Sequence, residues 1–174
     1  MFAKTIVITG PESTGKTTLA AQLSTHFQAQ WLPEYARGYI NGLDKPYSEN
    51  DLLKIAKGQV AAENAALNKT NELLFLDTSS EVIKIWSEYK YGRCHPWILK
   101  QIATRKHGLY LLCRPDITWQ FDPQRENPYN RDKIFDRYLE ELKNQNTNFV
   151  EINGLNYTRL NNAILHVESY IHIS

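Results

Sequence analysis

The segment that most constrains this chain is Gly10-Pro-Glu-Ser-Thr-Gly15-Lys16-Thr17, in which two glycines separated by four residues precede a lysine and a threonine. It follows a strand-like segment, residues 5–9, in which residues 6–8 form the short apolar run typical of a strand buried on both faces of a parallel sheet. It leads into residues 17–27, which have a helical pattern. Strand, glycine-containing turn and helix, in that order, are the context that a phosphate-binding loop requires. The segment therefore predicts a P-loop that holds a nucleoside triphosphate with Mg²⁺.

Each residue type in this loop has a physical reason. Glycines let backbone N–H groups turn inward and approach phosphate oxygens, and the start of the helix adds the positive end of its dipole. Lys16 can reach the β- and γ-phosphates, and the Thr17 hydroxyl can bind Mg²⁺. The residues assigned to the nucleotide, taken as ATP, are Gly10, Glu12, Ser13, Thr14, Gly15, Lys16, Thr17 and Thr18.

Strand-like and helix-like segments alternate along the rest of the chain. Further strands are expected at 30–32, 72–77, 109–113 and 149–152, and further helices at 48–67, 80–91, 96–106, 131–144 and 157–171. Because parallel strands are joined by right-handed crossovers, this alternation predicts an α/β fold with a doubly wound, five-stranded parallel sheet. Together with the phosphate loop, such a sheet resembles that of P-loop nucleoside and nucleotide kinases. No repeat or linker interrupts the pattern, so residues 1–174 are expected to form a single domain.

Composition and charge argue against several classes of protein. The 174 residues carry 20 Lys and Arg against 19 Asp and Glu, a formal net charge of +1 that does not suggest the basic face of a general nucleic-acid binder. No apolar run approaches the roughly 18 residues of a membrane span, and the start of the chain has no signal-peptide layout. Cys94 and Cys113 lack metal-ligand spacing and are expected to be reduced thiols. We expect a cytoplasmic protein without nucleic-acid or membrane partners; the sequence leaves its oligomeric state open.

Asp77 ends the third predicted strand and should therefore lie at the carboxyl edge of the sheet, where ligands bind in such folds. A carboxylate there can hold the metal through water or accept a proton from an attacking hydroxyl. The alternative is that Asp77 caps the helix that begins near Ser80. The two interpretations are compatible.

Glu34 and Arg37 follow the second predicted strand and should face the same crevice. Glu34 could bind or deprotonate an acceptor hydroxyl, and Arg37 could pair with Glu34 or with a phosphate. The alternative is an ordinary surface ion pair at helical spacing, which stabilises little.

Residues 114–131 contain three of the seven prolines and few aliphatic side chains, which favours a functional loop. Arg125 and Arg131 suit a lid that closes over the phosphates and brings cations to the charge that develops during transfer. Trp119 could stack on an aromatic or cationic ring. The alternative is a solvated loop with Trp119 packed into the core.

Taken together, these blocks resemble a known family. GPESTGKTTLA, PEYAR, IAKGQVAAE, FLDTS and LYLLCRPDITWQFDPQR, spread from residue 4 to about 154, are similar to the ribosylnicotinamide kinase domain of NadR-type proteins. The resemblance implies transfer of the ATP γ-phosphate to the 5′-hydroxyl of nicotinamide riboside, which gives nicotinamide mononucleotide and ADP. Two positions depart from the family pattern: Ser79 replaces the second carboxylate after the third strand, and Pro123 follows Asp122.

The phosphate-loop motif gives the roles of Lys16 and Thr17, and the resemblance implies that Glu34, Arg37, Asp77, Trp119, Asp122, Arg125 and Arg131 lie around the nucleoside and the lid. The expected catalytic residues are Lys16, Asp77, Glu34, Arg125 and Arg131. The expected substrate contacts are Glu34, Tyr35, Arg37, Asp77, Trp119 and Asp122, and the expected metal site is formed by Thr17 and Asp77. Because both departures lie near the expected acceptor site, a kinase for another nucleoside or a vitamin alcohol remains open. So does a regulatory P-loop ATPase, in which hydrolysis drives a conformational signal.

Overall fold

A computed structural model describes residues 4–70 and 72–173, with the side chain of residue 173 left aside. The strands are β1 (Lys4–Thr9), β2 (Gln30–Leu32), β3 (Leu73–Asp77), β4 (Leu109–Cys113) and β5 (Phe149–Ile152). The helices are α1 (Lys16–Phe27), α2 (Tyr35–Asn41), α3 (Glu49–Leu67), α4 (Ser80–Tyr91), α5 (Pro96–Thr104), α6 (Arg131–Asn144) and α7 (Asn156–Ile173). None of the helices in these ranges is long and apolar enough to cross a membrane.

The five strands form one parallel sheet in the order β2-β3-β1-β4-β5. The predicted doubly wound α/β fold is therefore confirmed. β1 lies in the middle, and the chain builds first toward β2 and β3 on one side and later toward β4 and β5 on the other. The connections on the two sides of β1 separate at its carboxyl end, which is where a ligand crevice opens in folds of this kind.

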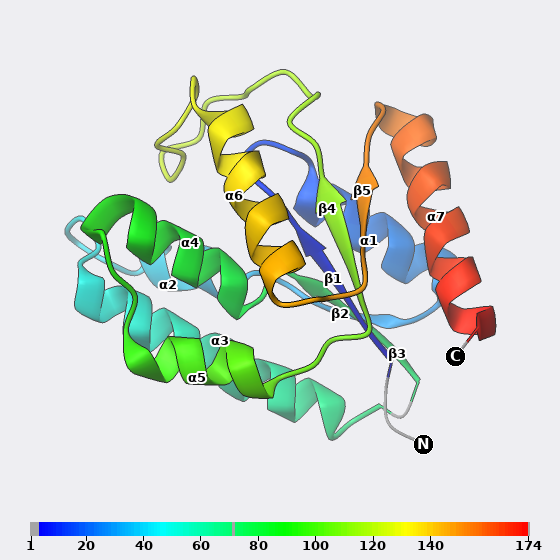
Figure 1. The fold of residues 1–174 in the computed structure, drawn as a ribbon, viewed down its shortest axis with the longest axis horizontal. Helices are drawn as coiled ribbons and strands as arrows, with labels where there is room; N and C mark the ends of the chain where they lie inside the picture. Colours follow the sequence, from blue (N-terminus) through cyan, green and yellow to red (C-terminus); the bar gives the residue numbers. More distant parts are fainter. Residues whose placement is uncertain (1–3, 71, 174) are drawn as a thin grey trace.

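Helices cover both faces of the sheet (Figure 1). On one face, Ile6 and Ile8 of β1 pack with buried side chains of α1 and α7. On the other face, Val7 packs with α4 and α6. This alternation follows from the two-residue period of a strand, and it explains why β1 is apolar on every residue from 6 to 8. A third cluster, formed by α3, α4 and α5, is centred on Ile55 and Ile98.

Helix α2 was not predicted from the sequence. This seven-residue helix has no buried residue, so it has no apolar stripe from which a helical period can be read. The other elements agree with the predicted ranges within two residues, and the capping box at the start of α3 is present: the Ser48 N–H and hydroxyl both donate to the Asp51 carboxylate, at 2.9 and 2.6 Å. These hydrogen bonds lower the pKa of Asp51 well below its usual range.

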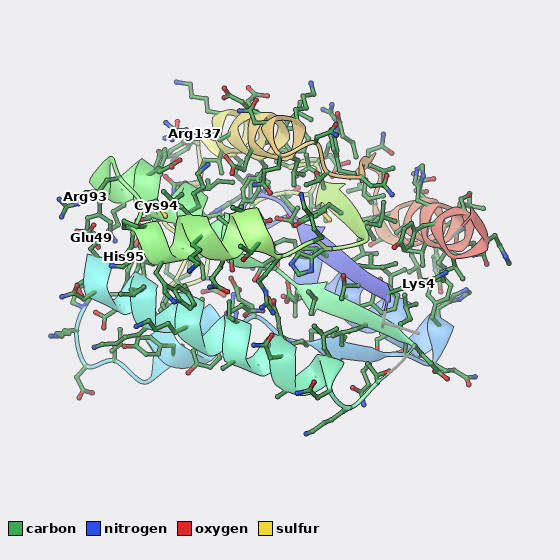
Figure 2. The ribbon with its side chains drawn as sticks, turned by 60° about the horizontal axis from the view of Figure 1, so that its bottom comes forward. Lys4, Glu49, Arg93, Cys94, His95 and Arg137 are labelled. Carbon is green, nitrogen blue, oxygen red and sulfur yellow. The ribbon has the colours of Figure 1, made fainter. Side chains whose placement is uncertain are left out.

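The polar residues around α5 have structural roles. Figure 2 shows Arg93 and Glu49 side by side at the surface, where the guanidinium donates to both carboxylate oxygens at 2.8 and 2.7 Å and joins the start of α3 to the segment after α4. His95 Nδ1 accepts a hydrogen bond from the Trp97 N–H at 3.1 Å and so caps α5. Cys94 is a half-buried free thiol.

Candidate active site

The predicted P-loop has the backbone of an anion cradle. Gly10 and Gly15 have φ angles of 134° and 74°, and Ser13 between them has a φ of 56°. A β-carbon on Gly10 would lie 2.6 Å from the Cys113 carbonyl oxygen of β4, so both the backbone conformation and the space require glycine there. Gly15 is the N-cap of α1, which places the positive end of the helix dipole at the loop.

Lys16 folds back over this loop. Its ammonium donates to the Pro11 carbonyl oxygen at 2.7 Å, and the Thr14 hydroxyl donates to the same oxygen at 2.8 Å. The cation therefore lies above the turn of backbone N–H groups, where phosphate oxygens would be bound.

Asp77 and Thr17 form the second part of the site. The register of the sheet pairs Ile8 with Asp77, so the last residue of β3 lies beside the end of β1 and next to the start of α1. The Thr17 hydroxyl donates to Asp77 Oδ2 at 2.6 Å, whereas the buried Asp77 Oδ1 has no hydrogen-bond partner among the described residues. Burial raises the pKa of Asp77, while the Thr17 hydroxyl and the Lys16 charge oppose that rise. Asp77 does not cap α4, whose N-cap is Ser79.

This pair fits the Mg²⁺ ion that a P-loop implies. A buried carboxylate with one unsatisfied oxygen beside a hydroxyl is the kind of oxygen donor set that Mg²⁺ prefers. The described residues contain no group of three His, Cys, Asp or Glu side chains that could enclose a metal by themselves. A site with few protein ligands is typical of Mg²⁺ bound together with substrate phosphates and water.

Glu34 faces the phosphate loop from the opposite side. It lies immediately before α2, and its charged neighbours are Lys16, Asp77, Arg37 and Asp122. Its carboxylate has no hydrogen bond from the described residues. Burial raises the pKa of Glu34, and Lys16 opposes the rise. A carboxylate that is largely withdrawn from water and left without a donor is available to a substrate hydroxyl.

A cavity of about 190 Å³ lies between Glu34 and the phosphate loop. Its polar end is formed by the loop, Glu34, Arg37 and Arg125, and its other walls are mainly apolar and aromatic. These walls come from four helices and three loops: Ala36, Ile40, Tyr47, Leu52, Ile55, Gln59, Thr78, Val82, Ile83, Trp86, Gln124 and Tyr138. We call this space the acceptor cavity.

A second cavity, of about 270 Å³, lies beside the other flank of the loop. It is lined by side chains of α1, the loop after β4 and the start of α7, among them Gln22, Ile117, Asn156 and Arg159. Ser13, Gly15, Thr18 and Arg125 line both cavities, so the phosphate loop lies at their junction. We call this second space the α7 cavity. Two molecules joined through a phosphate at the loop could therefore occupy both sides at once.

The segment between β4 and α6, which the sequence predicts to be a lid, contacts the phosphate loop. Arg125 Nη1 donates to the Gln120 carbonyl oxygen at 2.6 Å and approaches Ser13 Oγ at 3.4 Å. Arg131 Nη1 donates to the carbonyl oxygens of Ser13 and Ile117, at 3.1 and 2.8 Å. Both predicted arginines are thus beside the loop, but only Arg125 also lines the cavities.

Asp122 and Arg37 pair with each other across the acceptor cavity mouth, at 2.9 Å. This contact replaces the Glu34–Arg37 ion pair considered from sequence. The Arg125 N–H donates to the Asp122 carbonyl oxygen at 2.9 Å, which closes a four-residue turn. Pro123 occupies the second position of that turn, where its fixed φ is favoured. The family departure at Pro123 therefore stiffens the lid turn and costs it no required N–H donor.

Other predicted substrate contacts lie elsewhere. Trp119 is outside the lining of both cavities. Its ring makes an edge contact with Phe121, with the two ring centres 6.3 Å apart. Its indole nitrogen has no hydrogen-bond partner in the described part of the chain. Tyr35 also lies outside the lining, and its backbone N–H donates to Gln59 Oε1 at 3.1 Å.

Several residues of the site carried no clear signal in the sequence. Trp86 and Tyr138 lie on amphipathic helices, where an aromatic residue is usually a core residue. Arg159 is almost completely buried and donates to the carbonyl oxygens of Thr14 and Gly154, at 3.0 and 2.8 Å. Only the fold brings this arginine of α7 to the phosphate loop.

The order of the parallel sheet, the phosphate loop at the end of β1 and the Thr17–Asp77 pair define a P-loop nucleotide-binding domain of the kinase kind. Comparison with protein families agrees: residues 5–159 match a family model described as AAA domain. The match covers most of the chain, and the chain therefore belongs to this family.

Curated relatives confirm the resemblance seen in the sequence. The chain is 30% identical over 162 residues to the "Trifunctional NAD biosynthesis/regulator protein NadR" of Salmonella typhimurium (strain LT2), and 27% identical to the protein of the same name from Escherichia coli (strain K12). Each alignment covers 90% of this chain and 40% of the relative. The chain thus spans less than half the length of these relatives.

Solved structures agree with the fold. A NadR protein in complex with NR is 27% identical with a TM-score of 0.81, and one in complex with NAD and AMP-PNP is 24% identical with a TM-score of 0.84. Both comparisons cover 97% of this chain and 50% of the other. Deoxyadenosine kinase from M. mycoides has a TM-score of 0.67 at 14% identity, which shows the fold alone.

The close approach at Gly10 predicts the outcome of a paired substitution. Gly10→Ala should destabilise the protein by more than about 1 kcal/mol, because the new methyl group meets the Cys113 carbonyl and the backbone φ is unfavourable for alanine. Gly38→Ala, in α2 with nothing within 4 Å of the added carbon, should be neutral or stabilising by about 0.5–1 kcal/mol. Urea unfolding measures both, and equal midpoints for the two variants would contradict the crowding at Gly10.

Proposed function

We propose that this protein transfers the γ-phosphate of ATP, with Mg²⁺, to the 5′-hydroxyl of nicotinamide riboside and so makes nicotinamide mononucleotide and ADP. The observation that carries the proposal is the placement of Glu34 and the Thr17–Asp77 pair around one phosphate loop with a cavity on each flank. The similarity to NadR proteins, one of which was solved with NR, supports this choice of acceptor. ATP is an intracellular substrate, so we place the reaction in the cytoplasm.

The nucleotide half of the site follows from the loop. The triphosphate lies in the cradle between Gly10 and Thr17, and its nucleoside extends into the α7 cavity. Lys16 leaves the Pro11 carbonyl and moves its charge to the phosphate oxygens. Thr17 and Asp77 hold Mg²⁺, which when bound neutralises charge on the transferred group. Arg125, which lines both cavities, is placed to contact the γ-phosphate as it moves from one to the other.

The acceptor half requires a carboxylate that can receive a proton. Asp77 already accepts a hydrogen bond from Thr17 and is assigned to the metal, whereas Glu34 has no hydrogen-bond donor among the residues that the structure describes. We therefore assign Glu34 to orient and deprotonate the ribose hydroxyl. Arg37 is held at the cavity mouth by Asp122, and its guanidinium remains next to the polar end of the cavity.

The nicotinamide ring then lies in the apolar part of the acceptor cavity. Trp86 and Tyr47 line it, and the faces of such rings attract a cationic pyridinium. These two residues fit the ring-stacking role better than Trp119, which lines neither cavity.

A nucleoside panel tests the proposed function. The purified protein is incubated with ATP, Mg²⁺ and one acceptor at a time, including nicotinamide riboside, other nucleosides and vitamin alcohols, and the products are identified by mass. Nicotinamide mononucleotide should form with the highest kcat/KM. Phosphorylation of a different alcohol would reassign the acceptor, and ATP turnover with no phosphorylated acceptor would favour a regulatory ATPase.

Asp77→Asn should separate chemistry from nucleotide binding. The amide keeps the size of the side chain but removes the charge proposed to hold Mg²⁺, so kcat should fall by roughly 100-fold or more. ATP affinity, measured by calorimetry, should change little, because the backbone cradle and Lys16 are intact. Burial of Asp77 raises its pKa, so loss of this charge should not lower the melting temperature. A variant with unimpaired kcat would contradict the role of Asp77.

The pH profile should identify Glu34. Because burial raises the pKa of Glu34 above its ordinary value of 4.5, activity that needs its ionised form falls as pH drops through that raised pKa. We expect an acidic limb in kcat/KM above the usual carboxylate range, and a roughly 10²- to 10⁴-fold loss in Glu34→Gln together with disappearance of that limb.

Glu49→Gln, at a surface ion pair with Arg93, is the matched control and should keep the wild-type profile. If Glu34→Gln retained both its activity and the acidic limb, the titrating base would be Asp77 and the assignment to Glu34 would be wrong.

A further inference from the structure

The P-loop carries one feature that phosphate binding does not explain, a carboxylate at Glu12. A negative charge on this loop is unfavourable beside a triphosphate. Its hydrogen bonds instead run to the lid: Oε2 accepts from the Glu126 N–H at 3.0 Å and Oε1 accepts from the Asn127 N–H at 2.5 Å. Both carboxylate oxygens are thus used by two consecutive backbone donors of the segment that crosses the site.

The lid is prepared for this contact. The turn from Asp122 to Arg125 is closed by its own backbone hydrogen bond, and the Asp122 carboxylate also accepts from the Gln124 N–H at 3.0 Å. The two N–H groups that follow this turn are the ones that reach Glu12. Asn127 is almost fully buried, so its N–H would have no water to replace a missing carboxylate.

The Glu126 side chain is also held, by residues outside the phosphate loop. The Glu126 side chain accepts from the Lys90 ammonium of α4 at 3.1 Å and, more weakly, from the Tyr47 hydroxyl at 3.4 Å. The Lys90 ammonium also lies 3.8 Å from the centre of the Tyr47 ring. The backbone of residue 126 is therefore fixed to the phosphate loop while its side chain is fixed to the wall of the acceptor cavity.

We propose that Glu12 is a positioning residue that docks the closed lid, and that it does so in preference to contacting the nucleotide. This rests on the proposed kinase function. When the lid is docked, the Glu12 charge is turned toward two N–H donors and away from the phosphates. When the lid opens, the carboxylate is released beside the triphosphate and repels it. Nucleotide binding and lid closure consequently favour each other, and each strengthens the other by the same factor.

Docking has a chemical consequence. A closed lid keeps water from the γ-phosphate while the acceptor hydroxyl is in place. Loss of the Glu12 contact should therefore raise the share of ATP that is hydrolysed relative to the share that is transferred. Arg125 should also be misplaced, because the turn that carries it is no longer held.

The test compares Glu12→Gln, which has nearly the same size, with wild type and with Glu168→Gln on the exposed surface of α7. The amide can accept one of the two lid N–H groups but presents a donor to the other. We expect the ratio of hydrolysis to transfer to rise roughly tenfold in Glu12→Gln, in line with one lost buried hydrogen bond, while the melting temperature falls by no more than a few degrees. Glu168→Gln should match wild type in both.

A second readout needs no acceptor and so remains valid if the proposed function fails. Trypsin cleaves after Arg125 and Arg131 only when the lid opens, and a non-hydrolysable ATP analogue should protect the wild-type lid. Glu12→Gln should lose most of that protection. Unchanged cleavage together with an unchanged hydrolysis ratio would overturn the proposal. So would a rise confined to the acceptor KM, which would make Glu12 a substrate contact.

Discussion

The hydrogen bond between the Thr17 hydroxyl and the Asp77 carboxylate is the contact around which this site is organised. It exists because the sheet register places the end of β3 beside the end of β1, and because the turn from Gly10 to Gly15 brings the start of α1 back over both strands. Each of these conditions depends on backbone positions that tolerate little change. The position of the site therefore depends on the order of the strands in the sheet. The two cavities lie on either side of the phosphate loop, next to the Thr17–Asp77 hydrogen bond.

Much of the fold could be predicted from residue patterns. The strands could be recognised as unbroken apolar runs because both faces of the sheet are covered. The pattern of Ser48 and Asp51 correctly predicted the start of α3. α2 could not be found, because none of its residues is buried and its position is set by contacts such as the hydrogen bond from its first N–H to Gln59. Periodicity shows only helices that bury a stripe.

The candidate site also contains some residues that could be placed from the sequence and others that could not. Lys16, Thr17 and Asp77 could be placed from sequence because local geometry at the end of a strand decides where they lie. The contacts from Arg37 to Asp122, from Glu12 to Asn127 and from Arg159 to Thr14 could not be predicted, since each joins residues more than 80 positions apart in the sequence. The aromatic wall was missed because Trp86 has the helical spacing of a core residue.

Ser79, which stands where the family pattern has a second carboxylate, has a structural role outside the reaction space. The Ser79 hydroxyl donates to the buried carboxylate of Glu81, which also accepts from the Tyr110 hydroxyl at 2.7 Å. A carboxylate is thus present close to this strand end, but it is used in a buried network of side chains. Asp77 and Glu34 remain the two carboxylates near the phosphate loop that are proposed to act on the metal and on the acceptor hydroxyl.

In the proposed reaction, one phosphate loop serves two cavities that are filled at the same time. Calorimetric titration of nicotinamide riboside into the protein, with and without a saturating non-hydrolysable ATP analogue and Mg²⁺, tests it most directly. We predict one acceptor per chain in both titrations, with tighter binding when the analogue is present because the lid is then closed. Competition between the two ligands, or no binding of nicotinamide riboside in the presence of the analogue, would contradict the claim.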